Sequence, residues 1–203
     1  NFQKEKYFNV ELDCDGIPAV KPKIFNPDEA EQLRSRCQGS EAIVTAVKET
    51  EKKVKAPKLY DLTTLQREAN RIYGMTAKQT LDTAQSLYEK KLITYPRTDS
   101  QYLTEDMEQT ARNVVRQIYE KYQLTGPFDQ PEQPDVKKVM NNSKVTDHHA
   151  IIPTMELTSC HMDELKSWEE KILFLIAVHT VMAMSKDHIY QETEIEVECQ
   201  GEV

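Results

Sequence analysis

The chain has 203 residues, of which 38% are hydrophobic and 30% are charged, and its formal net charge is −8. This composition is typical of a soluble globular protein with one large domain or two small ones. No apolar run reaches the roughly 18 residues that a membrane-spanning helix needs, so we expect no membrane association. The chain does not open on a signal-peptide pattern, and its four cysteines form no C-x-x-C pair. These features favour a cytoplasmic, reducing location.

The distribution of charge is uneven. An acidic chain argues against a protein that binds nucleic acid over its whole surface. Ten Lys or Arg residues but only four acidic residues lie between Lys52 and Arg97, which gives this segment a net charge of +6. Either an anion-binding site or a set of ordinary solvated helix faces would explain it, and charge alone does not decide between them.

The first predicted elements are strands. Residues 1–20 alternate as a strand does and contain the turn "CDG", which predicts a hairpin. Asp13 and Asp15 have the D-x-D spacing of some metal sites, but the turn at Gly16 and the flanking strand pattern favour the hairpin over a metal site.

A helix and a strand follow the hairpin. The helix has Asn26 as its N-cap and Pro27 at its first position, and it ends before Gly39. Residues 42–54 are rich in β-branched side chains and then in charges, which predicts a strand.

The middle of the chain is predicted to be helical. One helix covers residues 62–73 and stops at Gly74, and a second, with a capping box at its start, covers 76–91. A third begins at Thr104 and runs to Tyr122, with acidic residues in its first turn. Residues 123–145 hold three of the nine prolines and are predicted to form a long loop.

The last two elements are a buried helix and a strand. Residues 167–184 begin with a capping box, Ser167 to Glu170, and are apolar almost all round, which predicts the centre of the core. Residues 189–200 alternate as a strand with one half-buried face and one polar face.

This order of elements predicts an α+β fold in which a mostly helical domain, residues 57–185, is inserted into a small β-rich domain, residues 1–56 and 186–203. The three strand regions are expected to pair in one separate small sheet. Because strand patterns lie at both ends, we interpret the chain as part of a longer protein.

The stretch "LITYPRTDS", residues 92–100, places Tyr95 between a short apolar run and a proline. Proline holds the residue before it in an extended conformation, so Tyr95 is expected at the end of a strand that Pro96 terminates. Arg97 shares a face with Tyr95, and its planar fork matches the phosphate that a tyrosine nucleophile would attack. Taken alone, the stretch also fits a packed strand tyrosine followed by a loop.

A second stretch, "TDHHAIIPT", residues 146–154, puts two adjacent histidines before an apolar run. Neighbouring side chains on a strand point to opposite faces, so one histidine would line a site while the other packs. An imidazole can donate a hydrogen bond to a phosphate. A metal would need a third ligand, and we find no E-x-x-H partner, so no metal site is predicted.

Together, "LYDLTTLQREANRIYGMTAKQTLDTAQSLYEKKLITYPRTDS" and "TDHHAIIPT" resemble the type IA DNA topoisomerases, and the bacterial topoisomerase III branch in particular. The resemblance is dense over residues 59–100 and 146–154 and holds mainly as order and spacing between them. It is weak over the first fifty and the last twenty residues. Several ordered motifs are far more specific than any one of them.

The resemblance implies a reaction. Tyr95 would attack a phosphate in single-stranded DNA, become linked to the 5′-phosphate and leave a free 3′-hydroxyl. Arg97 would stabilise the scissile phosphate, His148 would lie near the bound strand, and Asp99 would belong to the tyrosine loop. A second strand would pass through the gap, and religation would change DNA topology without ATP.

The resemblance also implies parts that these residues do not supply. Family members bind Mg²⁺ through a Toprim domain, which contributes a catalytic glutamate and lysine, so we expect no cofactor in this chain and no cleavage by it alone. Residues 57–185 would be the domain that bears the catalytic tyrosine. Residues 1–56 would be the N-terminal part of a β-rich arch, and 186–203 its return strand. The expected partners are single-stranded DNA and the remaining domains of the parent chain, without an oligomer, at the bacterial nucleoid.

Two other functions stay open at this point. The chain could be a module that binds single-stranded nucleic acid through a basic helical surface without catalysis. It could also be a hydrolytic or phosphotransfer enzyme that uses a tyrosine, but this would require a base or a metal cluster that we do not find in the sequence.

Overall fold

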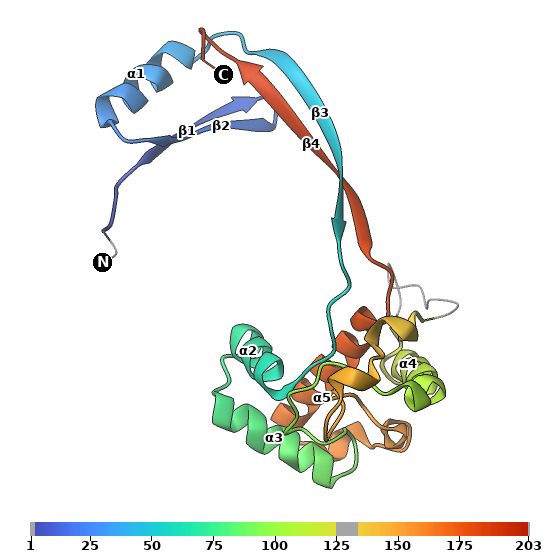
Figure 1. Cartoon of the computed structure of the whole chain (residues 1–203). Helices are drawn as coiled ribbons and strands as arrows, with labels where there is room; N and C mark the ends of the chain where they lie inside the picture. Colours follow the sequence, from blue (N-terminus) through green and yellow to red (C-terminus); the bar gives the residue numbers. More distant parts are fainter. Residues whose placement is uncertain (1–2, 125–133, 203) are drawn as a thin grey trace. The chain divides into compact units, whose positions relative to one another are not determined.

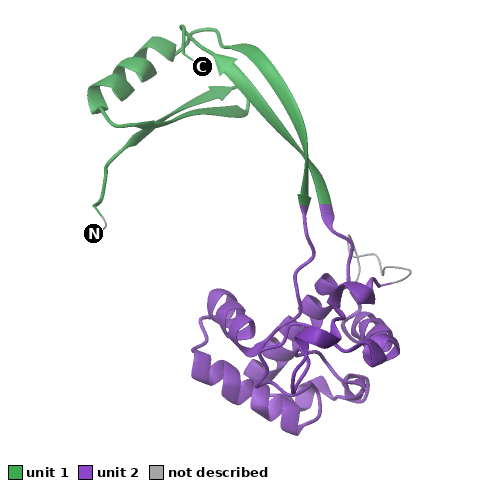
Figure 2. Ribbon diagram, in the orientation of Figure 1, with its two compact units in different colours: residues 1–53, 189–203 green, residues 54–188 purple. Residues whose placement is uncertain are grey.

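The computed structural model describes residues 3–124 and 134–202. Within these residues the chain has five α-helices and two two-stranded sheets, which confirms the predicted α+β class. The chain divides into a β-rich unit, residues 1–53 and 189–203, and a helical unit, residues 54–188 (Figure 2). None of the helices described is long and apolar enough to cross a membrane.

The β-rich unit begins with a hairpin of β1 (Phe8–Cys14) and β2 (Ile17–Ile24), which are antiparallel (Figure 1). Asp15 and Gly16 form its two-residue turn with φ angles of 54° and 89°, the conformation that Asp-Gly favours in tight hairpins. The Asp13 carboxylate accepts a hydrogen bond from the Gly16 amide at 2.7 Å. The two aspartates therefore shape the turn, as the hairpin interpretation predicted.

Helix α1 (Pro27–Cys37) covers this hairpin. As predicted, Asn26 is its N-cap and accepts a hydrogen bond from the Asp28 amide at 2.9 Å. The helix and the hairpin share a small apolar core that also takes in a residue from the C-terminal end of the chain. The buried members of this core are Ile24, Ala30, Leu33, Cys37 and Cys199.

Strands β3 (Ile43–Val54) and β4 (His188–Glu198) pair with each other and not with the hairpin, so the prediction of one common sheet is wrong. The half-buried alternation predicted for the last strand is wrong as well. Every residue of the two strands is exposed except Thr50 and Val197, which are partly buried. The physical reason is the same for both errors: α1 already covers the hairpin, and no described element covers β3 and β4.

The helical unit contains α2 (Leu62–Tyr73), α3 (Ala77–Glu89), α4 (Glu108–Tyr122) and α5 (Ser167–Ala183). Helix α2 ends at Gly74, as predicted, with a φ of 68°. Helix α5 contacts the other three helices and forms the centre of the core. Most of its apolar side chains are buried as predicted. Val178 is half-buried, and Trp168, Phe174 and Met182 are between 41% and 44% exposed.

The two ends of the helical unit lie together. The backbone amide of Ala56 donates a hydrogen bond to the Asp187 carboxylate at 3.1 Å. The ammonium of Lys138 also contacts this carboxylate, at 3.2 Å. The points where the chain enters and leaves the helical unit are therefore tied to each other within that unit.

Helix α4 starts later than predicted. A 3₁₀ turn, Glu105–Met107, precedes it, and the side chain of Asn142 accepts a hydrogen bond from the Glu105 amide at 2.8 Å. A side chain far along the chain thus caps this turn, whereas Thr104 makes no side-chain capping bond.

The predicted loop over 123–145 is described only in part, because residues 125–133 lie outside the described residues. The described part contains two 3₁₀ turns, Val136–Val139 and Asn142–Lys144. Val136 and Val139 are buried in the main core, so this end of the segment packs against the helices.

The start of α5 also differs from its prediction. Ser167 is the first helical residue and not the N-cap, and the carboxylate of Glu169, not Glu170, accepts from the amide of Lys166 at 2.9 Å. Glu169 is only 2% exposed. Its carboxylate also accepts hydrogen bonds from Ser86 and Lys90 on the last turn of α3 and the residue after it, both at 2.7 Å.

These contacts decide the charge of Glu169. Burial alone would raise the pKa of its carboxyl group, but hydrogen bonds from Lys90, Ser86 and the Lys166 amide, together with the charge of Lys90, lower the pKa to about 2. The buried carboxylate therefore stays ionised and joins α3 to α5.

This pKa predicts how stability changes in acid. The ordinary value is 4.5, so the unfolded chain takes up the proton first as the pH falls. The stabilisation by Glu169 is fully present above about pH 4.5 and is lost as the pH falls through about 2, with a total of roughly 3 kcal/mol. Urea unfolding of the wild-type chain and of Glu169→Gln between pH 2 and pH 7 would test this. The two free energies of unfolding should differ most near neutral pH and converge in acid, and a constant difference would contradict the assignment.

Candidate active site

The segment that bears Tyr95 leaves α3 through a hydrogen-bonded turn. The amide of Lys91 donates to the carbonyl of Tyr88 at 2.8 Å, and the amide of Leu92 donates to the carbonyl of Leu87 at 2.9 Å. This pair of bonds is the Schellman motif that ends many helices. Lys91 adopts a φ of 61°, which glycine accepts more readily than lysine. The end of α3 therefore fixes the direction in which the Tyr95 segment starts.

The Tyr95 segment then pairs with the second motif of the sequence. The amide of Thr94 donates to the carbonyl of Ile152, and the amide of Thr154 donates to the carbonyl of Leu92, both at 3.0 Å. Ile93 and Pro153 face each other in a single antiparallel bridge. This short pairing stops before Tyr95, as expected from the proline that follows it, and it brings together two segments more than fifty residues apart in sequence.

Three side-chain hydroxyl groups of the Tyr95 segment add hydrogen bonds to backbone carbonyls of residues 144–150. Thr94 donates to the carbonyl of Ala150 at 2.9 Å, and Thr98 donates to the carbonyl of His148 at 2.9 Å. Ser100 donates to the carbonyl of Lys144 at 2.8 Å. None of these residues was predicted to have a role, although the even spacing of 94, 98 and 100, on the other side of the segment from Arg97, was a usable signal.

Burial alternates along the segment. Pro96, Thr98 and Ser100 are buried, whereas Arg97 and Asp99 are exposed and Tyr95 is half-buried. Residues two apart thus lie on the same side, which is the arrangement that the extended conformation predicts.

The ring of Tyr95 contacts two other rings. Its centroid lies 4.3 Å from that of His148, with an interplanar angle of 47°. It lies 5.4 Å from that of Tyr88 on α3, with an angle of 75°, which is an edge-to-face contact. The structure therefore brings His148 against Tyr95, and it adds Tyr88, which was expected on the apolar face of its helix and not at the site.

The polar groups on this side of the segment have no partner within the described residues. Neither the Tyr95 hydroxyl nor the Arg97 guanidinium makes a hydrogen bond or an ion pair with a residue in 3–124 or 134–202. Tyr95 is half-buried, and its hydroxyl is not one of the buried side-chain oxygens that lack a partner, so solvent reaches it. Here a phenol and a cation two residues apart are both available to a bound anion.

His149 has a structural role. The Nδ1 of His149 lies 2.9 Å from the carbonyl of Ala150, and the ring is half-buried, unlike the exposed ring of His148.

In the core of the helical unit, the ring of Tyr60 stacks on that of His179 with centroids 3.7 Å apart. Burial lowers the pKa of His179, so this imidazole is neutral and donates from Nε2 to the carbonyl of Lys58 at 2.7 Å.

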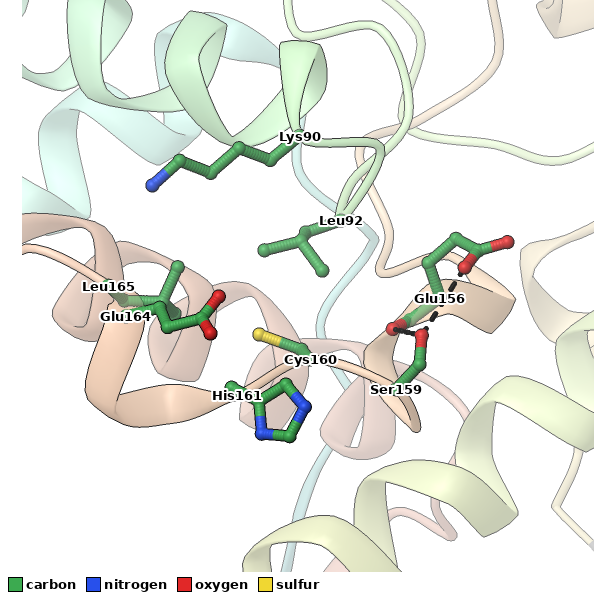
Figure 3. Close-up of a pocket in the computed structure, with 8 residues that line it drawn as sticks. All are labelled: Lys90, Leu92, Glu156, Ser159, Cys160, His161, Glu164 and Leu165. Atoms are coloured by element: carbon green, nitrogen blue, oxygen red, sulfur yellow. Dashed lines mark hydrogen bonds between the residues drawn. The ribbon is translucent and has the colours of Figure 1, made fainter.

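A separate cavity of about 430 Å³ lies beside the end of α3 and does not include Tyr95, Arg97 or His148 (Figure 3). Burial raises the pKa of the Cys160 thiol in it, so this sulfur is protonated and a poor nucleophile. The ammonium of Lys90 is already bound to Glu169. The cavity is lined by Lys90, Leu92, Glu156, Ser159, Cys160, His161, Glu164 and Leu165.

Comparison with known proteins identifies the family. A sequence profile described as DNA topoisomerase matches residues 1–203, the whole chain. The chain belongs to the DNA topoisomerase family. This agrees with the family that the two sequence motifs predicted.

Members of the topoisomerase family from bacteria match over nearly all of the chain. DNA topoisomerase 3 of Bacillus subtilis is 36% identical over 99% of this chain and 29% of its own length. DNA topoisomerase 3 of Staphylococcus aureus is 32% identical over 98% of this chain and 29% of its own length. The chain therefore spans less than a third of these curated relatives.

A solved topoisomerase has a similar fold. The structure of full-length topoisomerase I from Thermotoga maritima superposes with a TM-score of 0.68 at 26% sequence identity. The match covers 97% of this chain and 32% of that protein. The similarity thus extends over both the β-rich and the helical unit.

Thr98 offers a test of the pairing that builds this site. Its hydroxyl is buried, donates to the His148 carbonyl and accepts from the Ser100 amide at 3.1 Å. Thr98→Val keeps the shape but leaves both backbone groups without their partner, so we expect a loss of about 1–3 kcal/mol in the free energy of unfolding. Thr98→Ser, which retains the hydroxyl, should lose less, and equal losses in urea unfolding would contradict this role.

Lys91 offers a test of the turn that leads into the site. Replacing it by glycine removes the strain of the left-handed conformation at an exposed position. We expect Lys91→Gly to raise the free energy of unfolding by up to about 1 kcal/mol, and Lys91→Ala to give no such gain. A destabilised glycine variant in thermal or urea unfolding would show that the turn is not strained.

Proposed function

We propose that this chain is the tyrosine-bearing part of a bacterial type IA, topoisomerase III-like enzyme that cuts and rejoins single-stranded DNA. The observation that carries the proposal is the pair of unpartnered groups on one side of the segment, the Tyr95 hydroxyl and the Arg97 guanidinium. The family supports DNA as the substrate. Single-stranded DNA, the 5′-phosphotyrosine link and action at the nucleoid in the cytoplasm are parts of the proposal.

In the proposed reaction, the Tyr95 oxygen attacks a phosphorus atom of the DNA backbone and expels the 3′-oxygen of the preceding sugar. The phosphate gains a new ester bond to the Tyr95 oxygen and keeps its ester to the 5′-oxygen of the sugar on the other side of the cut, and the proton lost by the phenol balances the one gained by the 3′-hydroxyl. Religation reverses these steps, so no bond energy is lost and ATP is not required.

The roles of the neighbouring side chains follow from their chemistry. Arg97 would bind two non-bridging phosphate oxygens and stabilise the charge that develops on them. His148, whose exposed ring lies against Tyr95, would contact the bound strand. Asp99 lies on the same exposed side of the segment, and we assign it to the loop that positions the tyrosine.

A tyrosine hydroxyl has an ordinary pKa near 10, so attack at neutral pH requires a group that removes its proton. No described side chain forms a hydrogen bond with the Tyr95 hydroxyl. The described residues also hold no group of three or more side chains suited to a metal ion. We therefore expect the base and the Mg²⁺ site to belong to the Toprim domain of the longer protein.

The central test uses the full-length protein that contains these residues. Tyr95→Phe removes one hydroxyl and keeps the ring, so it should still fold and bind single-stranded DNA but form no covalent adduct. Arg97→Lys keeps the charge and loses the two-pronged contact, so it should cleave more slowly, at a cost of about 1.5–3 kcal/mol.

Oligonucleotides labelled at either end, trapped during cleavage and separated on denaturing gels, would report both outcomes. The adduct should retain the fragment on the 3′ side of the cut. If the Tyr95→Phe protein still forms an adduct, Tyr95 is a packing residue. If the wild-type protein and the Tyr95→Phe protein both bind DNA and neither of them cleaves it, the chain is a binding module.

The 203-residue chain by itself should be inactive. We expect no relaxation of supercoiled DNA and no cleavage of oligonucleotides, with or without Mg²⁺, because a missing proton acceptor and metal site remove orders of magnitude in rate. The same denaturing gels would detect any 5′-linked product. Such a product formed by this chain alone would contradict the assignment of the base and the Mg²⁺ site to the Toprim domain.

A further inference from the structure

The backbone around Tyr95 leaves the orientation of its side chain undetermined. The last pairing bond before it is made by the amide of Thr94, and the next bond after it is accepted by the carbonyl of Thr98 from Leu62 at 3.0 Å. Within the described residues, no backbone hydrogen bond involves Tyr95, Pro96 or Arg97 themselves. Whatever holds the phenol in one orientation must therefore act on its ring.

Two rings are available for this, and they come from different elements. His148 lies on the exposed "TDHH" segment, and its carbonyl is held by Thr98. Tyr88 lies in the last turn of α3 and meets the Tyr95 ring edge to face at 5.4 Å. Edge-to-face pairs are favourable because the positive edge of one ring meets the negative face of the other, so this contact prefers one orientation.

The position of Tyr88 is itself firmly fixed. Ser86 and Lys90, two residues before and after it, both bind the buried carboxylate of Glu169 on α5. Residues two apart on a helix point to roughly opposite sides, so this attachment leaves Tyr88 on the side away from α5. The Tyr88 carbonyl also accepts the Lys91 amide in the turn that ends α3.

Packing of the core does not account for this arrangement. Tyr88 is 40% exposed and belongs neither to the buried core nor to the partly buried side chains packed against it. An exposed aromatic side chain on a fixed helix end, placed against the half-buried Tyr95, fits a role in orienting that side chain. We propose that Tyr88 is a positioning residue for Tyr95, and that it acts through its ring and not through its hydroxyl.

This proposal rests on the proposed function, in which Tyr95 is the nucleophile. It predicts a difference between two substitutions in the full-length protein. Tyr88→Phe keeps the ring and should cleave DNA at the wild-type rate. Tyr88→Leu keeps much of the volume but loses the edge-to-face contact, and its single-turnover cleavage rate at saturating oligonucleotide should fall about 2- to 12-fold.

Affinity separates positioning from a general structural role. Because Tyr88 would act on the nucleophile and not on DNA, the dissociation constant for single-stranded DNA, measured by fluorescence anisotropy, should be the same in both variants. Their melting temperatures should also match that of the wild type, since the side chain is exposed. Tyr190→Leu is a matched control, because Tyr190 is 41% exposed and lies on β4 in the other unit, and its cleavage rate should not change.

The outcomes are distinguishable. If the wild-type protein forms no covalent adduct, the proposed function fails. If it does, and Tyr88→Leu cleaves as fast as Tyr88→Phe, only the positioning role of Tyr88 is overturned. Equal slowing of both variants would also overturn it, because the hydroxyl and not the ring would then be responsible.

A second measurement does not depend on catalysis. In the 203-residue chain, the ring resonances of Tyr95 in ¹³C-tyrosine spectra should keep their positions in Tyr88→Phe and shift in Tyr88→Leu, because the latter removes a ring that lies against them. Unchanged Tyr95 resonances in Tyr88→Leu would show that the two rings are not in contact, and the proposal would be overturned whether or not the leucine variant cleaves DNA.

Discussion

The candidate site depends on the attachment of the Tyr95 segment to the segment of His148. Backbone pairing at Thr94 and the hydroxyl of Thr98 hold the two together although they are about fifty residues apart in sequence. Without this attachment the exposed face would have a tyrosine but no histidine beside it. Because the contacts are made by backbone carbonyls and short hydroxyl side chains, the long side chains on the opposite side remain free for a ligand. The same short segment is thus rigid on its buried side and available on its exposed side.

Much of the fold could be predicted because its signals are local. The turn at Asp15, the N-cap at Asn26 and the stop at Gly74 each depend on one residue and its immediate neighbours, and the structure has all three. Errors occurred where a distant partner decided the outcome. Glu169 and not Glu170 binds at the start of α5, because Ser86 in α3 and Lys90 just after α3 bind the Glu169 carboxylate. The half-buried strand was wrong because alternation in sequence does not reveal whether any layer covers the strand.

In the candidate site, too, local patterns could be predicted and contacts between distant residues could not. Tyr95 and Arg97 could be singled out as candidates because a tyrosine before a proline, with an arginine two residues on, suggests a nucleophile beside a phosphate-binding cation. The stretch alone also fits a packed tyrosine, and only the resemblance over residues 59–100 and 146–154 favoured the catalytic interpretation. The contact of His148 with Tyr95 required the pairing of two segments, which no periodicity predicts. Tyr88 carried no signal at all, because an exposed tyrosine on an amphipathic helix is ordinary until its neighbour in space is known.

The bond between Ala56 and Asp187 has a consequence for the order of folding. Strand β3 is synthesised long before its partner β4, and all of the helical unit lies between them. Closing so long a loop in an unfolded chain carries an entropic cost that rises with loop length. Once the helical unit has folded, its two ends are already adjacent, and only a few residues separate each end from its strand. The inserted unit therefore acts as a template that joins the two strands of the surrounding unit, so β3 and β4 are expected to pair last.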